Sequence, residues 1–96
     1  MAIVKGSVTR IPIKVTTAGQ VALGAREVVS IHYVNTTAGV GRVDINDANE
    51  EANEGITLSS DAANGSDHWT SSQPVRFDGI IVRFTTGTGV VTIQTN

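Results

Sequence analysis

The sequence predicts an all-β fold: a small antiparallel β-sandwich or jelly-roll-like barrel with one long polar loop. Stretches rich in Val, Ile and Thr recur at roughly ten-residue spacing and are separated by turns that contain glycine, as in sandwiches and barrels. No connection is long and helical enough for a parallel crossover, so we expect antiparallel pairing. A chain of 96 residues suffices for one modest core, and we expect one β domain over 1–96.

The first predicted strand covers Ser7–Val15, where apolar residues alternate with Arg10 and Lys14. Pro12 lies within this strand and has no N–H to donate to a neighbouring strand. The strand therefore belongs at a sheet edge or beside a bulge. A turn and a short strand over 20–23 follow.

The central strand is predicted over Glu27–Asn35, after a break at Gly24. Val29, Ile31 and Tyr33 share one parity and give this strand a firmly apolar face. The opposite face is mixed, and fits either a second buried face or a subunit contact.

The remaining regular strands are predicted on both sides of a polar segment. Residues 40–45 form one strand, and Gly41 inside it indicates a bulge or a close approach of backbone. At the end of the chain, Gly79–Phe84 and Val90–Thr95 flank a glycine-containing turn. We expect them to pair as a closing β-hairpin, with no module appended.

The segment 46–74 is predicted to be a polar, acidic loop region. Asp47–Glu50 has the spacing of a capping box and predicts a weak helical turn. A short strand over 56–58 is followed by a long loop, Ser59–Gln73. Because long loops in small domains often carry function, this is the first place to look for a contact surface.

Composition excludes several classes of protein. There is no cysteine, which rules out disulfides, cysteine-ligated zinc and iron–sulfur clusters. No export signal is visible and no apolar run approaches the ~20 residues of a spanning helix, so we expect no membrane partner. The basic residues are spread singly and aromatic residues are few, so we expect no nucleic-acid partner.

The charges are unevenly distributed along the chain, whose net charge is −2. All seven Lys and Arg residues lie outside 43–75, and most of the nine acidic residues lie inside it. Such a division can orient a domain on a charged partner or on copies of itself. The alternative is a solvated acidic loop beside a mildly basic sheet.

No residue pattern indicates catalysis or a cofactor. Asp67 and His68 with nearby serines have the residue types of a hydrolase triad, but one short polar segment does not enforce the geometry of proton transfer. His32 is expected to be a structural residue, and two histidines without a converging carboxylate make a weak metal case. Asp44–Glu51 is the best calcium candidate, although it lacks the EF-hand spacing. We therefore expect a protein that is not an enzyme and binds no cofactor.

Two segments match the acceptor pattern for N-glycosylation. They are Asn35–Thr37 and Asn64–Ser66. Without a visible secretory route, both are interpreted as turn chemistry.

Trp69 is the most conspicuous candidate contact residue. A lone tryptophan in a polar segment is either an interface anchor or a lid over the edge of a small core. The N-terminal edge strand could also add to a partner's sheet. The predicted partner-binding residues are Trp69, His68, Asp67, Arg10, Pro12 and Lys14.

Three segments carry a resemblance to a known family: Ile11–Val15, Gln20–Val28, and Phe77–Val82 with the following Val90–Ile93. With them the chain resembles small virion structural proteins of tailed phages, of the head-decoration or cement type. The resemblance implies a homo-oligomer, with a trimer favoured, that is made in the host cytoplasm. It further implies binding to the major capsid protein on the outer capsid surface, where it stabilises the virion by bridging neighbouring subunits.

The resemblance transfers no functional residue, since it consists of pattern without a shared motif. Two other functions fit the same sequence. One is a carbohydrate- or receptor-binding β-sandwich module, and the other is a head–tail joining or tail subunit that forms a ring.

Overall fold

The computed structural model describes residues 12–48 and 55–96, and this part of the chain is all-β. All strand pairs are antiparallel and form one six-stranded sheet in the order β1-β6-β2-β5-β3-β4. The predicted fold class is thereby confirmed. No helix within these ranges is long and apolar enough to cross a membrane. The strands are β1 (Ile13–Val15), β2 (Gly19–Asn35), β3 (Gly41–Asp47), β4 (Gly55–Ser60), β5 (Ser66–Thr86) and β6 (Gly89–Thr95).

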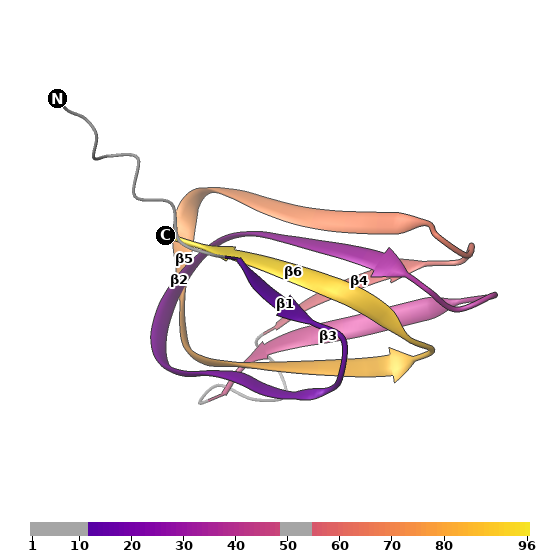
Figure 1. The fold of residues 1–96 in the computed structure, drawn as a ribbon. Coiled ribbons are helices and arrows are strands. Elements are labelled where there is room, and N and C mark those ends of the chain that lie inside the picture. Colours follow the sequence, from indigo (N-terminus) through magenta and orange to yellow (C-terminus); the bar gives the residue numbers. More distant parts are fainter. Residues whose placement is uncertain (1–11, 49–54) are drawn as a thin grey trace, which may run out of the picture.

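The sheet folds into two layers because its two longest strands bend. In the first layer, residues 28–35 of β2 lie between β6 and residues 66–75 of β5, and β1 pairs with the far side of β6. In the second layer, residues 80–86 of β5 pair with β3, whose other neighbour is β4. Figure 1 shows β2 and β5 curving from one layer into the other. The result is a small β-sandwich.

Glycines bend the long strands without ending them. Gly24 in β2 has φ 76° and Gly79 in β5 has φ 103°, values that favour glycine. The β2–β5 register shifts on either side of Ala22, as expected for bulges. The predicted strand break at Gly24 is therefore wrong: the residue kinks a strand that continues to Asn35.

The core fills the space between the layers. A register shift between Val28 and Ser30 moves Val28 to the inner face, so Val29, predicted to face inward, is only partly buried. The buried apolar residues are Val15, Ala22, Val28, Ile31, Tyr33, Val43, Ile45, Leu58, Phe77, Ile80, Val82, Val91 and Ile93.

The predicted long loop Ser59–Gln73 is wrong. Residues 55–60 form β4, a short turn follows, and β5 begins at Ser66. The first residues of β5 alternate between exposed and partly buried, but Trp69 is the one large apolar residue among them. Because nearly all of these residues are polar, their alternating burial does not appear as a hydrophobic pattern in the sequence. Of the expected helical turn, Asp47 belongs to β3 and residues 49–54 lie outside the described ranges.

The predicted closing hairpin is also wrong. The last strand, β6, pairs with β1 and β2, whereas the preceding residues of β5 pair with β3. The chain crosses between layers at Gly87, which has φ 69°. Beyond the crossing, the N–H of Thr88 donates to Oγ1 of Thr37 at 2.6 Å. The edge position predicted from Pro12 is confirmed, because β1 is the terminal strand of the sheet.

Candidate functional site

The predicted contact residues do not form one site. Lys14 and His68 lie on the outer face of the first layer, and exposed Pro12 immediately precedes β1. Asp67 and Trp69 have the opposite parity on β5 and point toward the second layer. Arg10 lies outside the described residues.

Of the two roles considered for Trp69, the structure shows the cover over the core edge. Its side chain is partly buried and packs against the core, which makes it a cover over the core edge. It also lines a hollow of about 270 Å³, the seam hollow, at the open side of the sandwich where β4 and the first half of β5 are edge strands. Val75, one of two exposed large apolar residues among those described, lies in the same hollow. The seam hollow is lined by Asp47, Gly55, Ile56, Trp69, Val75, Arg76 and Phe77.

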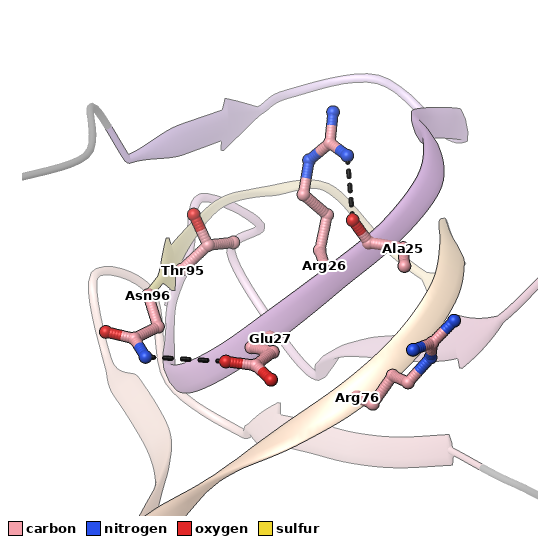
Figure 2. A pocket seen from close by; sticks show the side chains of 6 residues that line it. All are labelled: Ala25, Arg26, Glu27, Arg76, Thr95 and Asn96. Carbon is pink, nitrogen blue, oxygen red and sulfur yellow. Dashed lines mark hydrogen bonds between the residues drawn. The ribbon is translucent and has the colours of Figure 1, made fainter.

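A second, more polar hollow of about 540 Å³ lies where β2 and β5 bend (Figure 2). In this bend hollow, the Arg26 guanidinium donates to the carbonyl of Ala25 at 2.9 Å. Glu27 is held at the other side, where its carbonyl accepts the N–H of Asn96 at 2.7 Å and its carboxylate accepts the Asn96 amide at 3.4 Å. The lining residues are Ala25, Arg26, Glu27, Arg76, Thr95 and Asn96.

Arg76 belongs to both hollows and joins them into one surface. Its Nε and Nη2 atoms each lie 2.9 Å from Oδ1 of Asp78, two residues along β5. The Arg76 side chain is still 68% exposed. One carboxylate thus orients the guanidinium, while most of its surface faces solvent between an apolar hollow and a polar one. We call the two hollows together the Arg76 surface.

Apart from Trp69 and Asp47, the residues that build this surface were not singled out from the sequence. Arg26 and Arg76 are single basic residues in apolar strands, a pattern typical of any solvated sheet face. A usable signal was their position beside strand-interrupting residues, Gly24 and Pro74, where a bend exposes side chains.

Two acidic residues of the middle segment contact groups from other parts of the chain. Asp44 lies opposite Arg83 in the β3–β5 register, and its Oδ1 is 3.9 Å from Nε of Arg42. Asp47 is buried, and its carboxylate accepts the N–H of Asp78 at 3.1 Å. Asp44 and Asp47 are therefore placed against arginines and a backbone N–H group from outside residues 43–75.

The triad residue types and the calcium candidate are not assembled within the described ranges. Asp67 and His68 point to opposite sides of β5, and the Asp67 carboxylate accepts backbone N–H groups. Asp44 accepts the hydroxyl of Thr57 at 2.8 Å. Residues 49–51 of the calcium candidate lie outside these ranges, within which no three His, Cys, Asp or Glu side chains gather.

Comparison of the chain with protein-family models, with curated proteins and with solved structures finds no match in any of the three.

Proposed function

We propose that this chain is a non-enzymatic virion structural protein that binds the outer surface of an assembled capsid and stabilises it by bridging neighbouring subunits. The observation that supports this most is the Arg76 surface, in which one arginine connects an aromatic hollow with an arginine-lined hollow. The resemblance to decoration and cement proteins supplies the class of partner, the major capsid protein.

The composition of the Arg76 surface suits a protein partner. Tryptophan and arginine are the side chains most enriched at binding hot spots, and they act where a partner excludes water from a pocket. Here Trp69 and Arg76 come from one strand and lie opposite Ile31 and Glu27 of β2. Exposed Val75 adds apolar area between them.

The two hollows favour different partner groups. The seam hollow suits an apolar side chain, because Ile56, Trp69 and Phe77 line it. The bend hollow suits a carboxylate, because its two arginines outnumber its one acidic residue, Glu27, and a guanidinium binds carboxylates with paired hydrogen bonds. A capsid loop with an acidic residue next to an apolar one fits both. In an array, many such modest contacts add up to tight attachment.

Co-sedimentation with expanded capsids made from the major capsid protein tests this proposal. Wild-type protein is expected to pellet with capsids, and Arg76→Ala and Val75→Asp to remain in the supernatant. Both residues are exposed, so neither change disturbs the core. Arg83→Ala, an exposed arginine of the second layer outside both hollows, is the matched control and should pellet like wild type.

Two outcomes would overturn the proposal. One is a wild-type protein that never sediments with capsids. The other is binding to a glycan array that is lost in Trp69→Ala, which would replace the capsid by a sugar ligand. Sedimentation equilibrium of the free protein measures its mass, for which a trimer is expected.

A further inference from the structure

The chain has two histidines, and the structure places them opposite each other on neighbouring strands. His32 of β2 and His68 of β5 are register partners, and both are exposed. Their neighbours in the chain, Ile31 and Tyr33 on one side and Trp69 on the other, face the core. Both imidazoles therefore project from the outer face of the first layer. This corrects the expectation that His32 is a structural residue, since its imidazole lies in solvent and not among core side chains.

The pair belongs to a row that crosses the whole first layer. Lys14 of β1 lies opposite Thr92 of β6, which lies opposite His32. The remaining partners of the histidines' strands on this face are neutral: Ser30 lies opposite Thr70, and Val34 opposite Ser66. The imidazoles thus project side by side from one face, with one lysine two strands away and no carboxylate from the register partners around them.

Register partners on one face of an antiparallel pair have Cβ atoms about 4.5–5.5 Å apart. Imidazole nitrogens bind Zn²⁺ at about 2.0–2.1 Å, so two rings at this separation can converge on one ion. Residues 28–35 of β2 are paired to two strands, and residues 66–70 of β5 are paired to β2, so strand pairing holds the backbone at both histidines. Little ordering is required when an ion binds.

We propose that His32 and His68 form a two-imidazole site for a divalent transition-metal ion such as Ni²⁺, Cu²⁺ or Zn²⁺. Imidazole ligands select these ions over Ca²⁺ and Mg²⁺, which take oxygen ligands. With two protein ligands, the ion keeps positions for water or for a group from a partner. The site lies on the outer face of the first layer, contains no residue that lines the Arg76 surface, and does not rest on the proposed function.

Calorimetric titration of the untagged protein with NiCl₂ and ZnCl₂ tests the site. Wild type is expected to bind one ion per chain, and His32→Ala and His68→Ala each to lose at least about tenfold in affinity, since chelation needs both rings. The double variant should be no weaker than either single one. Thr70→Ala, on the same face of β5, is the matched control and should bind like wild type.

Thermal unfolding distinguishes chelation from unspecific binding. An ion that binds only the folded protein should raise the Tm of wild type and leave the Tm of both histidine variants unchanged. Equal Tm shifts in all proteins, or single variants that keep wild-type affinity, would overturn the proposal. CaCl₂ should give no heat with any of them.

Discussion

The Asp67 carboxylate accepts the backbone N–H of Ser59 at 3.1 Å and so connects the two layers at their open side. Its other oxygen accepts the N–H of His68 at 2.9 Å. Ser59 belongs to β4 and His68 to β5, the edge strands of the second and first layer. Unpaired N–H groups on edge strands invite pairing with other chains, and one carboxylate here covers one such group on each edge. Asp67, predicted as a partner contact, has an internal structural role in addition.

Asp67→Ala is expected to lower the free energy of unfolding by roughly 1–2 kcal/mol, because it leaves two N–H groups without their acceptor. It should also increase association at high concentration, since both edges become available. Urea denaturation and light scattering measure the two effects. Asp61→Ala, in the exposed turn after β4, is the control and should change neither. An unchanged urea midpoint in Asp67→Ala would show that solvent replaces the carboxylate without loss.

Asn35 makes hydrogen bonds to the turn after β2 and to the turn after β4. The residue is fully buried at the end of β2, and its side-chain oxygen accepts the N–H of Thr37 at 2.8 Å. Its backbone pairs with the turn between β4 and β5. One amide thus fixes two turns that are far apart in the sequence. The side-chain amide donates to the carbonyl oxygens of Gly39, Ser60 and Ala62 at 2.7, 3.1 and 3.1 Å.

Asn35→Asp is expected to be more damaging than Asn35→Ala. The aspartate keeps the shape but removes the donors and places a carboxylate against carbonyl oxygens, a loss of roughly 3 kcal/mol or more. Thermal unfolding followed by circular dichroism measures the order of the two variants. Asn64→Gly is the control: Asn64 has φ 63°, a conformation that glycine adopts readily, so the change should be small. Similar stability of Asn35→Asp and wild type would contradict this role of the amide.

The fold class could be predicted from the sequence, because apolar and polar residues alternate along most strands that cover the core. Prediction from the sequence failed for β5, where Trp69 is the only large apolar residue over the first seven positions. It failed again at the end of the chain, since alternation in β6 does not reveal whether the neighbouring strand is β5 or β2. The local hydrophobic pattern identifies β6 as a strand. Whether β6 joins the first or the second layer depends on the crossing of the chain at Gly87.

The residues of the candidate surfaces were harder to predict from the sequence than the fold class. Arg26 and Arg76 are fifty positions apart and come together because Arg76 lies opposite the neighbour of Arg26, Glu27, in the β2–β5 register. The two histidines meet through the same long-range register. By contrast, the turn role of Asn35 depends on local chemistry, and this prediction is confirmed. At Gly41 the close approach is made by the side chains of Tyr33 and Asn35 and not by another backbone segment.

Tyr33 makes stability depend on pH in alkaline solution. Its side chain is fully buried, and burial raises the pKa of its hydroxyl above the ordinary value of 10.0. The unfolded chain therefore releases this proton at lower pH than the folded protein. Stability from this group is complete below about pH 10 and falls as the pH rises further. Urea midpoints between about pH 8 and about pH 11.5 should decline more steeply in wild type than in Tyr33→Phe; parallel curves would exclude this origin of the decline.

Tyr33→Phe is also expected to change the free energy of unfolding little at neutral pH. The buried hydroxyl has no hydrogen-bond partner within the described residues, so its removal relieves a desolvated group at the expense of a small void. The expected change in unfolding free energy is within about 1 kcal/mol of zero. A loss above that range would show that the hydroxyl is bonded in solution, for instance to a buried water.

Position 41 has no room for a side chain, because the side chains of Tyr33 and Asn35 lie against it. A Cβ at position 41 would collide with the Tyr33 hydroxyl oxygen and with the Asn35 side-chain oxygen, both of which are buried. Gly41→Ala is therefore expected to destabilise by roughly 1–3 kcal/mol, the usual cost of overpacking. Gly39→Ala is the matched control, because a Cβ there meets no atom within 4 Å and should have little effect.

A double-mutant cycle with Tyr33→Phe separates the two collisions at Gly41. Removing the hydroxyl opens part of the space that the new methyl group needs, so the cost of Gly41→Ala should shrink by at least ~0.5 kcal/mol when it is combined with Tyr33→Phe. The remaining cost reports on Asn35, whose amide cannot move without releasing its turn contacts. Denaturant unfolding of the four proteins measures the coupling. Strict additivity would place the whole cost on Asn35 and show that the tyrosine ring yields freely.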